Sequence, residues 1–255
     1  MDGNESLEKA GQLGQWLLPT GYTRPAVLAH RGRHDRWREN TLEAFADAVS
    51  CGADGVELDV RQTGDGALVV HHDALVPRLG PIAELTRAEL PDWLPTLGQA
   101  LDTCAGYVVD VEIKHSPLEP GYDPSEAIAA AVAGVVSDAM TVARRPRAVL
   151  VTSFFPATLR AVTTACPSLP TGLLVLPALD AVAALDEAAR AGCRALLPFR
   201  SQVTPELVAA AHDRAMAVVA WTVDEDDDLR SAAAAGCDAV VTDRVERACA
   251  VLGGG

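Results

Sequence analysis

Short apolar runs alternate with longer segments of helical spacing along most of the chain. After residue 25 the pattern predicts eight strands, at residues 25–32, 56–60, 107–114, 147–154, 171–176, 194–199, 217–223 and 238–243. It predicts eight following helices, at residues 41–51, 96–104, 124–138, 156–166, 179–191, 205–214, 225–235 and 245–252. Strands and helices that alternate at this spacing are typical of a parallel sheet covered by helices.

Eight strand–helix units in one chain of 255 residues favour a closed (β/α)8 TIM barrel over an open, doubly wound sheet. We therefore expect an α/β fold with a single barrel domain at residues 25–255, preceded by a lead segment at 1–24 with a helix around Leu7 to Leu18. No G-x-G-x-x-G motif follows the first strand, which argues against a dinucleotide-binding fold.

The sequence also predicts a helix N-cap and one segment that is only partly helical. Asn40 is a plausible N-cap for the helix that begins at Thr41, because its amide oxygen can accept from the first free backbone N–H groups. The segment from Leu75 to Leu94 is rich in proline and is predicted to be only partly helical, around Ala83 to Leu90.

Composition excludes several classes of partner. The formal net charge is −14, so a basic surface for nonspecific nucleic-acid binding is not expected. No run of 18 or more apolar residues is present, so stable membrane insertion is not expected. The first residues are acidic and lack a basic region followed by an apolar stretch, which predicts no secretory signal. The six cysteines form no C-x-x-C pair and are expected to be reduced and buried, as in a cytoplasmic protein.

The strand at residues 56–60 carries two carboxylates that share a face. Side chains alternate along a strand, so Glu57 and Asp59 point one way while Val56, Leu58 and Val60 point toward the helices. Two acids side by side on a buried inner face repel each other and lose hydration, and a divalent cation relieves both penalties. An exposed pair of this kind would more often be only solvated.

A second polar face on the next predicted strand strengthens the metal interpretation. In YVVDVEIK, Asp110, Glu112 and Lys114 share one face. Glu112 can join the first two carboxylates in an all-oxygen site, which suits a hard cation, Mg²⁺ or Ca²⁺, better than Zn²⁺. Lys114 is one of only two lysines in the chain, which suggests a required charge rather than a solvated surface residue.

The remaining candidates stand at strand ends, where barrel active sites lie. The first strand ends in His30 and Arg31, and the extension of the second ends in His72 and Asp73. Acids for a cation, basic residues for phosphate oxygens and two histidines for proton transfer describe a phosphate-ester site. A purely structural barrel, in which the acids pair with Arg31 and Lys114, would leave one of three acids without a base.

Ordered motifs along the chain resemble those of the glycerophosphodiester phosphodiesterase family. They are HRG at 30–32, ENT-x-x-AF at 39–45, GADGVELDV-x-x-T-x-DG at 52–66, VVHHD at 69–73, EIK at 112–114, TSF at 152–154, WTVD at 221–224 and GCDAVVTD at 236–243. The resemblance implies a TIM barrel that uses a divalent cation to hydrolyse glycerophosphodiesters to glycerol 3-phosphate and an alcohol.

The same resemblance implies roles for individual residues. It makes His30 and His72 the acid/base pair. It makes three acids the metal ligands, and the chain has them at Glu57, Asp59 and Glu112. It makes five further residues substrate-binding or supporting: Arg31 and Lys114 on the phosphate, Glu39 and Asn40 bracing the mouth, and Trp221 on the alcohol side.

The sequence departs from the family pattern at three places. These departures bear on which leaving group is preferred, while the residues expected for catalysis are all present. Arg38 replaces a usual proline before ENT, Val245 replaces a common proline after the final T-D-x, and the segment after Asp73 is short. Two alternatives therefore stay open. One is a lysophospholipase D-like phosphodiesterase, which an apolar groove would favour, and the other is a non-catalytic barrel that binds a phosphate metabolite.

Overall fold

The computed structural model describes residues 23–143 and 145–253. The helix expected around Leu7 to Leu18, and with it most of the lead segment, lies outside the described residues.

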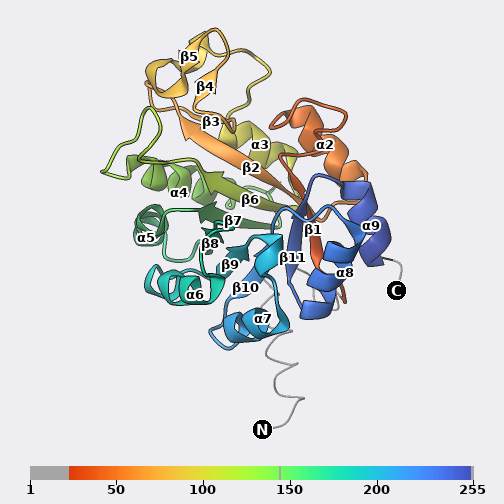
Figure 1. The fold of residues 1–255 in the computed structure, drawn as a ribbon. Coiled ribbons are helices and arrows are strands. Elements are labelled where there is room, and N and C mark those ends of the chain that lie inside the picture. The colour runs from red at the N-terminus through yellow and green to blue at the C-terminus, as the bar shows by residue number, and fades with distance from the viewer. Residues whose placement is uncertain (1–22, 144, 254–255) are drawn as a thin grey trace.

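Eight parallel strands close into a barrel within the described part of the chain (Figure 1). They are β1 (Ala26–His30), β2 (Gly55–Gln62), β6 (Val108–Ile113), β7 (Ala148–Ser153), β8 (Thr171–Val175), β9 (Ala195–Pro198), β10 (Ala217–Ala220) and β11 (Ala239–Thr242). Each strand pairs in parallel with its neighbours in chain order, and β1 pairs with both β11 and β2, which closes the ring. The predicted TIM barrel is confirmed.

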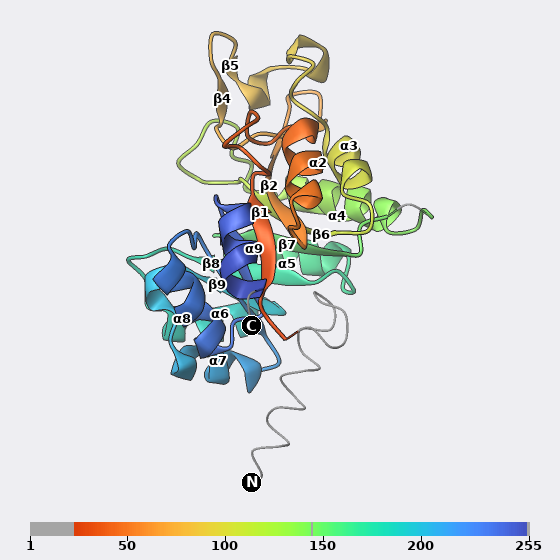
Figure 2. The same cartoon turned by 90° about the vertical axis from the view of Figure 1, so that its right-hand side faces the viewer.

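Helices surround the barrel on its outside, as the two perpendicular views show (Figure 1, Figure 2). They are α2 (Leu42–Ser50), α3 (Leu97–Thr103), α4 (Ala127–Ala139), α5 (Pro156–Ala165), α6 (Ala181–Arg190), α7 (Pro205–His212), α8 (Asp226–Ala235) and α9 (Val245–Gly253). The outward strand residues Val56, Leu58 and Val60 belong to the core between strands and helices, as their alternation predicted.

Inside the barrel, a smaller apolar core fills the part nearest the strand N-termini. Leu28, Val108 and Val219 are among its members, and each is fully buried. Along the same inward-facing rows the residues become polar toward the C-terminal ends, with His30 following Leu28 and Asp110 following Val108. The bottom of the barrel is therefore a packed core, and the C-terminal rim is where charged groups gather.

Strand register brings the predicted acids to one place. In the β2–β6 pair, Asp59 lies opposite Glu112 and Glu57 lies opposite Asp110. In the β1–β2 pair, His30 lies opposite Glu57. Residues far apart in sequence thus become neighbours on the inner face at the rim.

An excursion between β2 and α3 projects above the rim, at the top of Figure 1. Its strand β3 (Leu68–Val70) runs antiparallel to β2, and β4 (Leu75–Val76) pairs with β5 (Gly80–Pro81). The 3₁₀ helices η2 (Ile82–Glu84) and η3 (Arg87–Glu89) follow, where partial helix was expected. A further 3₁₀ turn, η4 (Arg200–Gln202), follows β9.

The N-cap expected at Asn40 is wrong by one residue. Helix α2 is capped by Thr41, whose hydroxyl accepts from the Ala44 N–H. Asn40 has a left-handed φ of 57° and donates its amide N–H to Asp59 Oδ2 at 2.7 Å. The Asn40 side chain, which the local sequence pattern assigned to capping, therefore binds Asp59 on β2, outside the helix.

Gly55 should be required at the start of β2. A Cβ added there would lie 2.2 Å from the Val108 backbone oxygen and 2.8 Å from the Val108 Cβ. Both atoms belong to the neighbouring central strand, so Gly55→Ala should lower the free energy of unfolding by about 1–3 kcal/mol. In urea denaturation the matched control is Gly98→Ala in α3, where an added Cβ meets nothing within 4 Å. That control should be neutral or slightly stabilising, and equal stability of the two variants would contradict the packing described.

Candidate active site

Three buried carboxylates form the centre of the rim. Ligand oxygens of Glu57, Asp59 and Glu112 all lie within 4.8 Å of one another. Asp59 is completely inaccessible to solvent, and the other two are at most 7% exposed. The strand register of β2 and β6 accounts for this cluster, and it brings together all three residues predicted as metal ligands.

Two basic residues pair with this cluster but do not neutralise it. Lys114 Nζ lies 2.7 Å from Glu112 Oε1 and 3.1 Å from Asp59 Oδ1. Arg31 Nε lies 3.2 Å from Asp59 Oδ2, and its Nη1 lies 3.2 Å from Glu39 Oε2. Arg31 and Lys114, which were expected to contact phosphate, therefore contact carboxylates in this structure.

The pKa values of the acids follow from this imbalance. Burial, followed by repulsion from Asp59 and Glu112, raises the pKa of Glu57 well above its usual range. Burial also raises the pKa of Glu112, although Lys114 opposes the shift. For Asp59, burial is outweighed by Lys114 and Arg31, which lower its pKa. Of the three acids, Glu57 is therefore the one whose ionised form is least favourable.

The donor set fits a hard divalent cation. Glu57 Oε2 accepts from the Arg31 backbone N–H at 3.0 Å, but Glu57 Oε1 is buried and has no hydrogen-bond partner among the described residues. A buried carboxylate oxygen without a donor is unusual unless an ion or water completes it. Three carboxylates with only oxygen donors match Mg²⁺ or Ca²⁺.

Arg31 and Asn40 are held in unusual backbone conformations beside the acids. Their φ angles are 56° and 57°, in the left-handed region that non-glycine residues rarely adopt. The Asn40 N–H donates to the Arg31 carbonyl at 3.0 Å, and Asn40 Oδ1 accepts from the Asp59 N–H at 3.2 Å. These bonds join the β1–α2 loop to β2 and hold the Arg31 and Asn40 side chains against Asp59.

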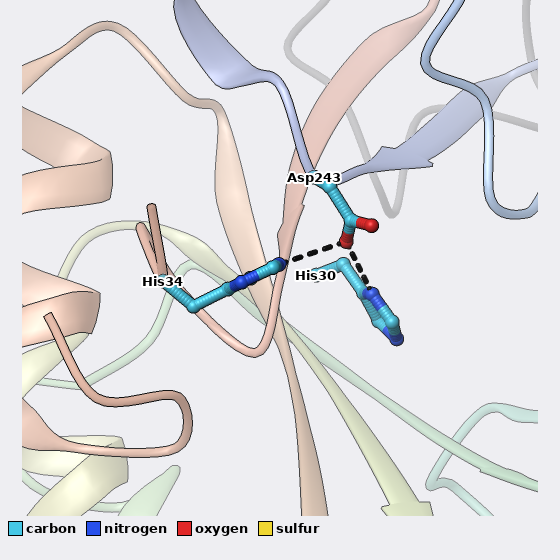
Figure 3. Close-up of side chains that lie close together, drawn as sticks. All are labelled: His30, His34 and Asp243. Atoms are coloured by element: carbon cyan, nitrogen blue, oxygen red, sulfur yellow. Dashed lines mark hydrogen bonds and ion pairs between the residues drawn. The ribbon is translucent and has the colours of Figure 1, made fainter. Parts of the chain in front are cut away.

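His30 lies at the end of β1, where its ring meets the Asp243 carboxylate (Figure 3). Its Nδ1 is 2.6 Å from Asp243 Oδ1, and its Nε2 is 4.0 Å from Glu57 Oε2. An ionised carboxylate can only accept, so Nδ1 carries the hydrogen and Nε2 of a neutral ring is free to accept a proton. His34 Nε2 approaches the same Asp243 oxygen at 2.9 Å.

Asp243 is strongly acidic because of these two rings. Burial opposes ionisation, but hydrogen bonds from His30 and His34 lower the pKa of Asp243 far below its usual range. In return, the hydrogen bond to Asp243 raises the pKa of His34.

His72 lies two residues after the end of β3, in the excursion between β2 and α3. Its Nδ1 pairs with Asp73 Oδ1 at 2.8 Å, which again leaves Nε2 free. Burial, and then the nearby charge of Lys114, lowers its pKa. The charge of a protonated His72 also helps to lower the pKa of Asp59, after the effects of burial, Lys114 and Arg31. The adjacent His71 instead packs against Trp93, with ring centroids 5.9 Å apart.

Arg61 on β2 holds the segment that carries His72. Its Nε and Nη2 donate to the His72 carbonyl at 2.8 and 2.5 Å, and its guanidinium makes a two-point pair with Glu119 from the β6–α4 loop. These contacts tie the excursion to the β6–α4 loop beside a cavity of about 40 Å³ that Lys114 also lines.

Trp221 stands on the opposite, aromatic half of the rim. Its ring packs edge-on against Phe154 and Phe199, with centroids 5.5 and 5.4 Å away, and its indole N–H donates to the Leu197 carbonyl at 2.8 Å. Among the described residues, Trp221 makes no hydrogen bond or ring contact with the carboxylates. Arg38, which departs from the family pattern, places its guanidinium 3.9 Å above the Trp93 ring.

Four residues of this site were not given roles from the sequence: His34, Arg61, Asp110 and Asp243. Asp110 was visible as a third polar residue on the face of Glu112. Arg61 continues the alternating face of Glu57 and Asp59, and Asp243 ends the last predicted strand. The contact of His34 with Asp243 joins residues 209 apart in the sequence, so local patterns do not show it.

The rim places three carboxylates, two basic side chains and the His30 ring at the C-terminal ends of barrel strands, an arrangement that a barrel hydrolase of phosphate esters would need. Residues 30–247 match the model of the Glycerophosphoryl diester phosphodiesterase family. The chain belongs to this family and is a phosphoric diester hydrolase.

Individual relatives agree with this assignment. The chain is 32% identical over 241 residues to a glycerophosphodiester phosphodiesterase of Caldanaerobacter subterraneus subsp. tengcongensis, which covers 86% of this chain and 94% of that protein. It is similar to the solved glycerophosphodiester phosphodiesterase of Thermotoga maritima, with 25% identity, a TM-score of 0.70 and coverage of 88% and 97%. It shares its fold with an Oleispira antarctica phosphodiesterase solved with sn-glycerol-3-phosphate, at 24% identity, a TM-score of 0.77 and coverage of 90% and 97%.

Across the part of the chain that the structure describes, every helix is too short or too polar to cross a bilayer.

Asp110 should make stability depend on pH in chelated protein. Burial raises its pKa to about 8, against the opposing hydrogen bond from Thr152, whereas an unfolded aspartate titrates near pH ~3.9. The folded state holds the proton more tightly, so stability is kept below the unfolded pKa and falls as pH rises toward the folded pKa.

Asp110→Asn keeps the acceptor for Thr152 and removes this titration. Its advantage in free energy of unfolding over wild type should be near zero at pH ~4 and should grow by on the order of 1 kcal/mol per pH unit toward pH ~8. Urea denaturation in chelator across that range measures it, and a constant difference at all pH values would contradict the assignment.

Proposed function

We propose that the chain hydrolyses glycerophosphodiesters to glycerol 3-phosphate and an alcohol, with a divalent cation and two histidines as acid and base. The observation that carries this proposal is the buried Glu57, Asp59 and Glu112 cluster, with its unpaired Glu57 oxygen, flanked by His30 and His72. The Oleispira antarctica phosphodiesterase, which was solved with sn-glycerol-3-phosphate, supports this product class.

Glu57, Asp59 and Glu112 would hold the cation, with Mg²⁺ or Ca²⁺ as the expected identity. When bound, a divalent cation supplies Lewis-acid stabilisation of negative charge that develops on the non-bridging phosphate oxygens. Arg31 and Lys114 already face the same space through their pairs with Asp59. They would bind the phosphate oxygens and orient the diester, and Arg31 can do so with two N–H groups at once.

His30 is suited to act as the base on the attacking oxygen. Asp243 holds its Nδ1–H, so Nε2 can accept a proton on the side that faces Glu57. His72 is suited to donate a proton to the leaving alcohol, because its lowered pKa makes its protonated form a stronger acid. The base takes one proton from the attacking water, and the acid gives one proton to the leaving alcohol. The protons therefore balance over the hydrolysis.

The rest of the rim would support and select the substrate. Glu39 and Asn40 brace Arg31 and Asp59 through the contacts described above. Trp221, in its aromatic cluster, would line the side of the alcohol.

A lysophospholipase D-like activity is the second candidate, and exposed leucines favour testing it. Leu75 and Leu79 on the β4–β5 segment are 51% and 44% exposed, and Leu118 in the β6–α4 loop is 95% exposed. These segments follow the strands that carry the acids, so an acyl chain could rest on them. A non-catalytic phosphate-binding barrel is less well supported, because both histidines and all three acids are present.

Removal of one metal ligand should weaken cation binding and turnover together. Glu57→Gln should reduce Mg²⁺ or Ca²⁺ affinity by at least about tenfold, because it removes an anionic oxygen from the cluster. Chelated protein would be titrated with Mg²⁺, Ca²⁺ or Mn²⁺ and assayed on glycerophosphodiesters and on a lysophospholipid, with released glycerol 3-phosphate or lipid phosphate as readout.

Glu187→Gln on α6 is the control for that series, since Glu187 pairs only with surface arginines in the described structure. Full activity after exhaustive chelation would remove the cation from the proposal. A preference for the lysophospholipid would favour the second candidate.

Loss of either histidine should reduce turnover while cation binding persists. His30→Ala and His72→Ala should each lower kcat by on the order of 10²-fold to 10⁴-fold. A nitrophenyl ester leaves without protonation, so the variant that lacks the acid should recover on that substrate and the variant that lacks the base should not. We expect recovery for His72→Ala.

His71→Ala is the matched control, because His71 packs on Trp93 beside His72. It should change kcat little. If it were as damaging as His72→Ala, the assignment of the acid to His72 would be wrong.

A further inference from the structure

A second group of metal-ligating side chains lies next to the carboxylate cluster and contains nitrogen donors. In the described residues, one ligand atom each from His30, His34 and Asp243 lies within 4.8 Å of the other two. Figure 3 shows the two imidazole rings meeting one carboxylate oxygen from different sides. The distances to Asp243 Oδ1 are 2.6 Å from His30 Nδ1 and 2.9 Å from His34 Nε2.

Backbone structure holds these three donors together. His30 ends β1, which pairs with β11 immediately before Asp243, with Ala29 opposite Thr242. The loop to His34 turns at Gly32, whose φ is 78°, and the His34 N–H donates to the Gly32 carbonyl at 3.0 Å. The Asp243 N–H donates to Asp224 Oδ1 at 2.8 Å. The donors therefore meet through strand pairing and a tight turn.

The chemistry of this group differs from that of the carboxylate cluster. Two imidazole nitrogens and one carboxylate oxygen suit Zn²⁺, whereas Mg²⁺ and Ca²⁺ prefer oxygen donors. Three protein ligands leave a fourth tetrahedral position for water or substrate. The side chains of His30, His34 and Asp243 are 21%, 29% and 36% exposed, so an ion can reach them from solvent.

We propose that His30, His34 and Asp243 form a Zn²⁺ site whose occupancy inhibits the enzyme. Zn²⁺ would bind His30 Nδ1, His34 Nε2 and an Asp243 oxygen in place of the two hydrogen bonds. Each neutral ring would then keep its single proton on the other nitrogen. His30 Nε2 would carry that proton and could not accept another, so the ring could not serve as a base.

Zn²⁺ binding and inhibition of the enzyme by Zn²⁺ are supported by different observations. Zn²⁺ binding follows from the three ligands alone, while inhibition rests on the proposed function of His30 as base. The two parts are therefore measured separately, binding without substrate and inhibition during turnover.

The binding experiment uses chelator-treated full-length protein in excess Mg²⁺, titrated with Zn²⁺ against a chromophoric chelator. Loss of a residue that only supports a ligand weakens metal affinity by about 10–100-fold, so loss of the ligand in His34→Ala should weaken Zn²⁺ affinity at least as much. His34→Gln is the second variant, because it can still donate a hydrogen bond to Asp243 but lacks the imidazole.

His212→Ala is the matched control for loss of a histidine paired with an aspartate. His212 Nε2 lies 2.9 Å from Asp238 Oδ2, the same kind of contact, but in the described chain this pair belongs to no group of three metal-ligating side chains. His212→Ala should bind Zn²⁺ as wild type does. Equal Zn²⁺ affinity in wild type and both His34 variants would overturn the site.

The inhibition experiment measures glycerophosphodiester hydrolysis at fixed, saturating Mg²⁺ with increasing Zn²⁺. The Zn²⁺ concentration for half inhibition should rise at least about tenfold in His34→Ala and His34→Gln, in step with the loss of affinity. An unchanged value in variants that bind Zn²⁺ weakly would overturn the inhibitory role. Because Zn²⁺ affinity is measured without substrate, a failure of the proposed hydrolysis would not be mistaken for a failure of the site.

Discussion

Repulsion among three buried carboxylates is the constraint on which the rim depends. Glu57, Asp59 and Glu112 share one small space on β2 and β6, and Lys114 and Arg31 neutralise only part of their charge. A buried charge without a partner destabilises a fold strongly, so such a cluster persists only where something else completes it. A divalent cation would complete it and would release the two basic side chains toward a phosphate group. Under the proposed function, the same few side chains would set stability without the cation and catalysis with it.

The two halves of the rim differ in their chemistry. Strands β1, β2, β6 and β11 carry the charged groups, while Phe154, Phe199 and Trp221 form an aromatic surface at the ends of β7, β9 and β10. Loops join these halves to the excursion above them. Arg61 is central to that connection, because it binds the His72 carbonyl and Glu119 at once. The backbone of His72 is therefore held by a guanidinium from β2.

Patterns within single strands predicted much of this molecule, and contacts between distant segments account for what they missed. Alternation along β2 placed Glu57 and Asp59 inward, and repeated strand–helix units predicted the closed barrel. Asn40 was assigned to a helix cap because local sequence cannot show that Asp59 offers it a partner. His34 and Asp243 are separated by 209 residues and meet only because β1 and β11 close the ring. The pairing of Lys114 with the acids likewise depends on the register of β2 with β6.

If the carboxylate cluster is a cation site, anomalous diffraction from crystals grown with Mn²⁺ will show the ion there. Mn²⁺ shares the preference of Mg²⁺ for carboxylate oxygens and can be located by its anomalous signal. We predict one strong peak bonded to oxygens of Glu57, Asp59 and Glu112, with Lys114 no longer paired to both Asp59 and Glu112. If no peak appears at that position and the Lys114 pairs stay intact at Mn²⁺ concentrations that support turnover, the carboxylate cluster is not the cation site.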